Sequence, residues 1–175
     1  MAALAEDPAW ARRAAQRGIA VDPQHTFTFL GSYHRLARCW ARAVLGEDPA
    51  GAAAAAEELI ATALLDPPRS GLATWCGLLA EMWLAAGKPV EAEAALDRAD
   101  RFLSTYGQRY PEGLLLLLRA RLLQARGAPT DVVRAAAERA HARSTEREAH
   151  LFAHRAEQFL AELARDEAAE EPLNG

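Results

Sequence analysis

The stretch YPEGLLLLLRARLLQARGAP, residues 110–129, places five consecutive leucines, Leu114–Leu118, in a chain of which 25% is charged. A helix that spans a membrane needs about 20 consecutive apolar residues, but here Arg119 and Arg121 follow the leucines at once. An arginine at the centre of a membrane costs about 2.5 to 3.5 kcal/mol to insert, whereas each leucine contributes roughly 0.5 kcal/mol. The stretch is therefore predicted to be a buried helix of a folded domain.

Prolines and glycines recur at a fixed spacing around this stretch. Four prolines are 41, 40 and 40 residues apart: Pro8, Pro49, Pro89 and Pro129. Three of them come shortly after a glycine: Gly46, Gly87 and Gly127. Proline suits the first turn of a helix, and glycine suits the position just past a helix end. Each glycine–proline step therefore predicts that one helix ends and the next begins, with Asp7 and Asp48 as N-caps of two of these helices.

A small apolar face follows each of these four prolines. Its positions are spaced i, i+4, i+7, which is one face of a helix, and they are Ala11, Ala15 and Gly18; Ala52, Ala56 and Leu59; Ala92, Leu96 and Ala99; and Val133, Ala137 and Ala140. A repeat of this length is typical of helix pairs that stack and bury each other's flanks. The run Leu114–Leu118 is then predicted to lie in the inner helix of the third pair, with neighbours on both sides.

A second set of prolines predicts the other helix of each pair: Pro23, Pro67/Pro68 and Pro111, with Asp22 and Asp66 as caps of the first two. Together the two sets predict eight helices, near 8–19, 23–45, 49–65, 71–86, 89–106, 111–126, 130–144 and 146–165. We expect a single helical-repeat domain over residues 1–166 and a flexible acidic tail over 167–175.

Composition favours an all-α protein and argues against several functions. Hydrophobic residues make up 51% of the chain, mostly Ala and Leu, and long Val/Ile/Thr alternations typical of strands are missing. The net charge of −4 argues against a nucleic-acid partner. Cys39 and Cys76 fall in helical patterns and are predicted to be reduced core thiols. The start MAALAEDPAW lacks the features of a signal peptide, so a cytoplasmic location is expected.

These helix pairs resemble tetratricopeptide (TPR) repeats, with units near 40 residues rather than the common 34. The clearest stretch is LLAEMWLAAGKPVEAEAALDRADRFL, residues 78–103, and GIAVDP, residues 18–23, is similar to the close of a TPR second helix. With GQRYPEGLLLLLRARLLQARG after it, the chain is similar to the C-terminal helical sensor regions of bacterial signal-transduction ATPases and LuxR-type regulators. The resemblance implies a right-handed solenoid that binds other molecules on the concave side of its inner helices.

Helical phasing predicts which side chains face that concave groove. They are Tyr33, His34, Trp40, Thr74, Glu81, Arg121, Gln124, His154 and Glu157. We expect the groove to take a protein segment or a small effector as a non-catalytic scaffold or regulator, without a cofactor or a membrane. A homodimer is a further expectation, because the chain begins on half a helix pair and leaves Trp10 near an open end.

Two alternatives to a binding module stay open at the level of sequence. His150 and His154 lie one helical turn apart, a spacing found in zinc sites, but a site needs a third ligand and the pattern HExxH is absent. An enzyme or metal protein centred on this pair is one alternative, although we predict neither catalytic residues nor metal ligands. The other is a helical-repeat protein that binds nucleic acid, against which the acidic balance counts.

Overall fold

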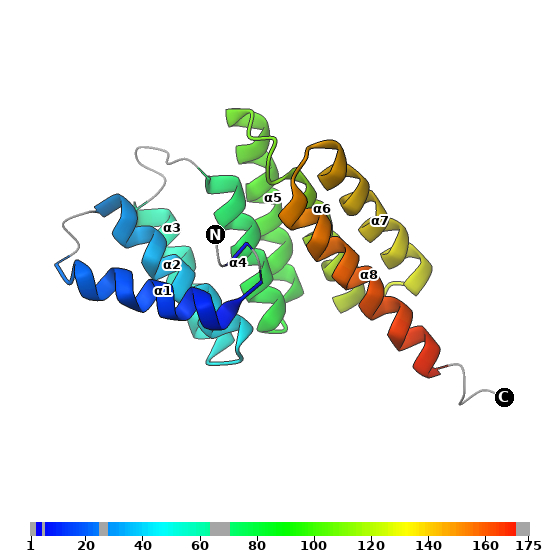
Figure 1. Cartoon of the computed structure of the whole chain (residues 1–175), viewed down its shortest axis with the longest axis horizontal. Coiled ribbons are helices and arrows are strands. Elements are labelled where there is room, and N and C mark those ends of the chain that lie inside the picture. The colour runs from blue at the N-terminus through cyan, green and yellow to red at the C-terminus, as the bar shows by residue number, and fades with distance from the viewer. Residues whose placement is uncertain (1–2, 5, 25–27, 64–70, 171–175) are drawn as a thin grey trace.

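The computed structural model describes residues 3–4, 6–24, 28–63 and 71–170. Within these ranges the regular structure is entirely helical, which confirms the all-α prediction. The eight helices there are α1 (Pro8–Val21), α2 (Thr28–Val44), α3 (Pro49–Ala63), α4 (Leu72–Ala85), α5 (Pro89–Tyr106), α6 (Glu112–Ala125), α7 (Thr130–Glu146) and α8 (His150–Glu170). Figure 1 shows them as an extended array, with α1 to α3 at one end and α7 and α8 at the other.

The observed helix starts confirm the prediction made from the first set of prolines. Helices α1, α3 and α5 begin at their prolines, and Pro129 is the N-cap of α7. Asp7 Oδ1 accepts a hydrogen bond of 2.8 Å from the backbone N–H of Trp10, and Asp48 Oδ1 accepts one of 3.1 Å from that of Gly51. Both aspartates therefore cap the exposed N–H groups of a first turn, as predicted.

One turn recurs after α2, α4 and α6. The glycines of these turns have positive φ angles of 77°, 67° and 73°: Gly46, Gly87 and Gly127. The residue after each glycine donates its N–H to the carbonyl five residues back, at 2.8 to 3.0 Å, in the pairs Glu47–Arg42, Lys88–Trp83 and Ala128–Leu123. This bond is typical of the Schellman turn, in which glycine adopts the left-handed conformation without steric cost. The same type of turn thus ends three helices that are spaced about 40 residues apart.

Helix packing separates the array into two layers. Helices α2, α4, α6 and α8 each contact the next member of this series, whereas among the described residues α3, α5 and α7 contact only the helices before and after them in sequence. At one end, α1 contacts α2 and no other described helix. These neighbour contacts are consistent with a helical repeat, and we call α2, α4, α6 and α8 the inner helices.

The repeated apolar face of α1, α3, α5 and α7, which we call the outer helices, is buried. Eleven of its twelve positions are at most 7% exposed, and the twelfth is Gly18. A Cβ added at Gly18 would lie only 2.3 Å from Cε1 of His34. A larger residue at position 18 would therefore require the His34 side chain to move.

The leucine run of α6 is buried on two sides. Leu114, Leu115 and Leu118 belong to a core that extends through α2, α3 and α4, whereas Leu117 belongs to a second core with α7 and α8. A helix with packed neighbours on both sides is apolar over most of its circumference. The predicted position of the run inside the array is confirmed.

The predicted start of the second helix at residue 23 is wrong. Residues 23–24 form a turn and α2 begins at Thr28, while Asp22 caps the end of α1 by donating its N–H to Gly18 O at 3.3 Å. The fixed φ of Pro23 suits a turn as well as a first helical turn, so proline alone did not separate the two. Asp66, Pro67 and Pro68 lie outside the described residues.

The boundary between α7 and α8 also differs from the prediction. Helix α7 continues to Glu146 and α8 begins at His150, rather than at 146. The hydroxyls of Ser144 and Thr145 donate to the carbonyls of Ala140 and His141, so both residues remain within the helix. Helix α8 runs to Glu170, past the expected start of the tail at 167, and residues 171–175 lie outside the described part.

Both cysteines are buried free thiols, as predicted. Burial raises the pKa of Cys76 to about 11 and also raises the pKa of Cys39. No helix in the described ranges is both long enough and apolar enough to span a bilayer.

Candidate functional site

The inner helices bring a group of charged side chains together around Glu81 of α4. Oε2 of Glu81 accepts a hydrogen bond of 2.7 Å from the indole N–H of Trp40 on α2. Oε1 accepts bonds from Arg121 of α6, at 3.0 Å, and from Arg155 of α8, at 2.5 Å. Glu6, which precedes α1, adds a second carboxylate: its Oε1 lies 2.9 Å from Arg121 and 2.7 Å from Arg155. We call these five residues the inner charge cluster.

The cluster is deeply buried at its centre and partly open at its edge. The side chain of Arg155 is 1% exposed and that of Glu81 is 8% exposed, against 23% for Arg121 and 22% for Glu6. Charges taken out of water need close partners of opposite sign. Here two guanidinium groups face two carboxylates, yet Nε and Nη1 of Arg155 have no hydrogen-bond partner among the described residues.

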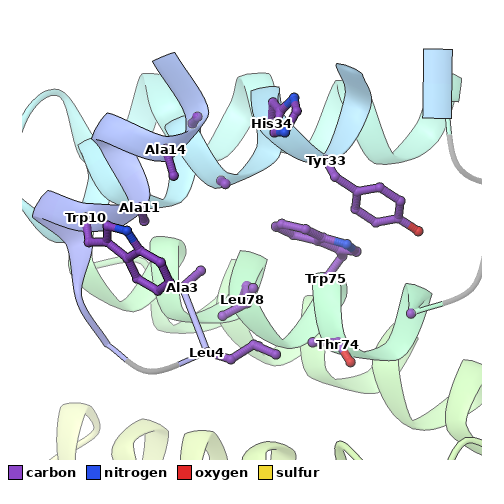
Figure 2. Close-up of a pocket in the computed structure, with 13 residues that line it drawn as sticks. Ala3, Leu4, Trp10, Ala11, Ala14, Tyr33, His34, Thr74, Trp75 and Leu78 are labelled. Carbon is purple, nitrogen blue, oxygen red and sulfur yellow. The ribbon is translucent and has the colours of Figure 1, made fainter. Parts of the chain in front are cut away.

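A cavity of about 480 Å³ lies between α1, α2 and α4, and we call it the aromatic pocket. Its lining is mostly apolar and consists of Ala3, Leu4, Trp10, Ala11, Ala14, Ala15, Tyr33, His34, Ala37, Gly71, Thr74, Trp75 and Leu78. The rings of Tyr33 and Trp75 lie 5.5 Å apart, centre to centre. Figure 2 shows Trp75 rising from α4 toward Tyr33 and His34, with Trp10 on the far side. Such a pocket offers flat apolar walls to a side chain or a small molecule.

A second hollow of about 470 Å³ lies beside the inner charge cluster, with which it shares Glu81 and Arg121, and we call it the distal hollow. Its lining comes from all four inner helices: Val44, Glu81, Leu84, Ala85, Arg121, Gln124, Ala125, Phe159 and Glu162. The guanidinium of Arg121 lies over the ring of Phe159, 5.5 Å from its centre. Glu81 and Arg121 therefore belong both to the cluster and to this hollow. We call the surface made by the aromatic pocket, the cluster and the distal hollow the inner face.

Most of the predicted groove residues lie on the inner face. Trp40, Glu81 and Arg121 meet in the charge cluster, where Trp40 is fully buried and acts through its indole N–H. Tyr33, His34 and Thr74 line the aromatic pocket. Gln124 lines the distal hollow.

His154 and Glu157 lie apart from these groups, on an exposed side of α8. Glu157 Oε1 is 3.0 Å from Nε2 of His141 on α7, and this hydrogen bond is the main reason that the pKa of Glu157 is lowered. His154 Nε2 lies 3.1 Å from the side-chain amide of Gln158, and its side chain is 66% exposed. In the described ranges no three His, Cys, Asp or Glu side chains gather as metal ligands.

Sequence reasoning missed Glu6, Arg155 and Trp75 as members of the inner face. Arg155 is adjacent to the predicted His154, so an assignment of the face of α8 shifted by one residue would have found it. Trp75 is adjacent to the predicted Thr74 in the same way. Glu6 precedes the first helix, where no helical phasing applies.

No family model, no curated protein and no solved structure matches this chain. What the chain does has to be inferred from its own residues and their arrangement.

Proposed function

We propose that the chain is a non-catalytic binding module, a right-handed TPR-like solenoid whose inner face is a groove for a protein segment or a small effector. On this proposal it belongs to, or derives from, a bacterial regulatory protein of the cytoplasm. The repeated Schellman turns and the series of contacts between inner helices support the repeat architecture. In stacked repeats of this kind the inner helices form the surface available to ligands.

The observation that carries the proposal is the chain of contacts Trp40–Glu81–Arg121. These residues lie 41 and 40 positions apart on three successive inner helices, and they are joined by direct hydrogen bonds. Equivalent positions of successive units thus converge on one place, flanked by the aromatic pocket and the distal hollow. Apolar hollows beside a few fixed polar groups are typical of binding sites.

The chemistry of these groups favours binding over catalysis. The guanidinium groups of Arg121 and Arg155 present only hydrogen-bond donors in a fixed geometry, which suits them to holding an anion. Glu81 is engaged by three donors, which fix its orientation. A fixed set of donors and acceptors recognises a ligand by shape and charge complementarity.

A selection from a displayed random-peptide library against the whole chain tests this function. We expect enriched peptides whose affinity falls by about tenfold or more in Arg121→Gln, because a charge-assisted hydrogen bond is lost on the inner face. Arg119→Gln is the matched control: Arg119 lies on the same helix, but its partners are Asp97 and Asp100 of α5. Its effect should stay within about twofold, as for an exposed pair elsewhere on the surface. Peptides that bind equally well to both variants, or no enrichment at all, would contradict the proposal.

A further inference from the structure

Three described residues before α1 already lie on the inner face, and we call Ala3, Leu4 and Glu6 the N-terminal segment. Ala3 is only 5% exposed and belongs to the large core, and Leu4 packs against the same core. Both residues line the aromatic pocket, while Glu6 reaches across to α6 and α8. In Figure 1 the segment, in dark blue, runs over α4 before α1 begins, and Figure 2 shows Ala3 and Leu4 beside Leu78 of that helix.

Side chains rather than backbone hydrogen bonds hold this segment in place. Its backbone has one such bond among the described residues, from Glu6 N–H to Ala3 O at 3.4 Å. Glu6 also has a φ of 53°, in the left-handed region that disfavours a residue with a side chain. The carboxylate contacts of Glu6 therefore hold a strained backbone, and an occupant without that strain has an advantage over it.

When Glu6 is out of its place, the other residues of the inner charge cluster require an anion at the position of its carboxylate. Without Glu6, Arg121 and Arg155 carry two positive charges against the single carboxylate of Glu81. Arg155 is 1% exposed and already has two nitrogens without partners, so water at the surface does not compensate this charge. A carboxylate matches a guanidinium in both charge and geometry.

We propose that Glu6 occupies the position of a carboxylate of the partner, which is an acidic protein segment that displaces Ala3, Leu4 and Glu6 from the inner face. This inference rests on the proposed function and names the partner's chemistry. The sequence of this segment indicates what the partner carries. We expect a leucine that enters the aromatic pocket and, two residues later, an acidic residue that binds Arg121 and Arg155. An internal occupant lowers the apparent affinity for the partner by the fraction of molecules in which the site is open.

Fluorescence anisotropy with a labelled peptide ALAED, which has the sequence of residues 3–7, tests the inference on the whole chain. We expect Glu6→Gln to bind this peptide about tenfold tighter than the unchanged chain, because the internal occupant is weakened. A peptide ALAQD should bind Glu6→Gln about tenfold more weakly than ALAED, since it lacks the carboxylate at the position that corresponds to Glu6. Adding Arg121→Gln to Glu6→Gln should remove the gain, whereas adding Arg119→Gln should keep it.

The outcomes separate this inference from the function on which it rests. Equal affinities of the unchanged chain and Glu6→Gln, or of ALAED and ALAQD, would overturn the inference, even if library peptides bind through Arg121 and the function stands. Displacement of the labelled peptide by acetate as efficiently as by unlabelled ALAED would overturn the choice of a protein segment. Glu6→Asp is the second variant: it keeps the charge but retracts it by one methylene, and it should bind ALAED with intermediate affinity.

Discussion

Glu81 is the residue on which the inner face depends most, because it is the common acceptor for Trp40, Arg121 and Arg155. We predict that Glu81→Gln lowers the free energy of unfolding by about 3 to 5 kcal/mol, since it leaves the guanidinium groups of Arg121 and Arg155 to share the single carboxylate of Glu6. Urea denaturation followed by circular dichroism measures this change.

The matched control for Glu81→Gln is Glu57→Gln. Glu57 pairs with Arg98, also 41 residues away, but its side chain is 41% exposed. Its loss should cost no more than about 1 kcal/mol, as for other surface pairs. If Glu81→Gln and Glu57→Gln lowered the free energy of unfolding equally, burial of the cluster would add nothing to its stabilising effect.

For single residues, the sequence was informative where a position recurs in successive helix pairs. Trp40, Glu81 and Arg121, which helical phasing predicted to face the groove, hold equivalent positions on successive inner helices and meet in the inner charge cluster. Glu6 was not predicted, since its partners Arg121 and Arg155 lie more than a hundred residues away and no local pattern connects them. Trp40, which phasing also placed facing the groove, is fully buried.

Among the elements, the contact between α6 and α7 is unusually close at Gly113. A Cβ added there would lie 2.0 Å from Ser144 Oγ and 3.2 Å from Ser144 Cα. In an open helix, glycine to alanine gains about 1 kcal/mol, but here overpacking should dominate. We predict that Gly113→Ala lowers the free energy of unfolding by about 1 to 3 kcal/mol.

A double-mutant cycle with Ser144→Gly tests the origin of this loss. If the two residues compete for the same space, the double variant is less destabilised than the sum of the single variants, by about 0.5 kcal/mol or more. Strict additivity of the two changes in unfolding free energy would rule out the steric explanation.

The elements also show why some helix boundaries were predictable and others were not. Local signals define α1, α3 and α5: an N-terminal proline begins each of them, and Asp7 and Asp48 cap two of these starts. The start of α2 has no such signal, because Pro23 serves a turn instead. The end of α7 depends on whether Ser144 and Thr145 bond to their own helix, which their sequence leaves open.

In the whole molecule, the inner helices form both the core and the candidate binding surface. Helix α6 contributes to two apolar cores, one toward α4 and one toward α7 and α8, so it couples the two ends of the array. The inner charge cluster crosses the same junction, since it joins α2, α4, α6 and α8 with the segment before α1. The packing that stabilises the array therefore also fixes the geometry of the inner face.

The four tryptophans allow the central claim, that ligands bind on the inner face, to be measured directly. Trp40 belongs to the charge cluster and Trp10 and Trp75 line the aromatic pocket, whereas Trp83 lines neither the pocket nor the distal hollow. The measurement is a titration of the whole ¹⁵N-labelled chain with a library-selected peptide, followed through the indole N–H signals by NMR. We predict that the signals of Trp40 and Trp75 shift while that of Trp83 stays in place. A shift of Trp83 alone, or unchanged signals of Trp40 and Trp75 at saturation, would contradict the claim.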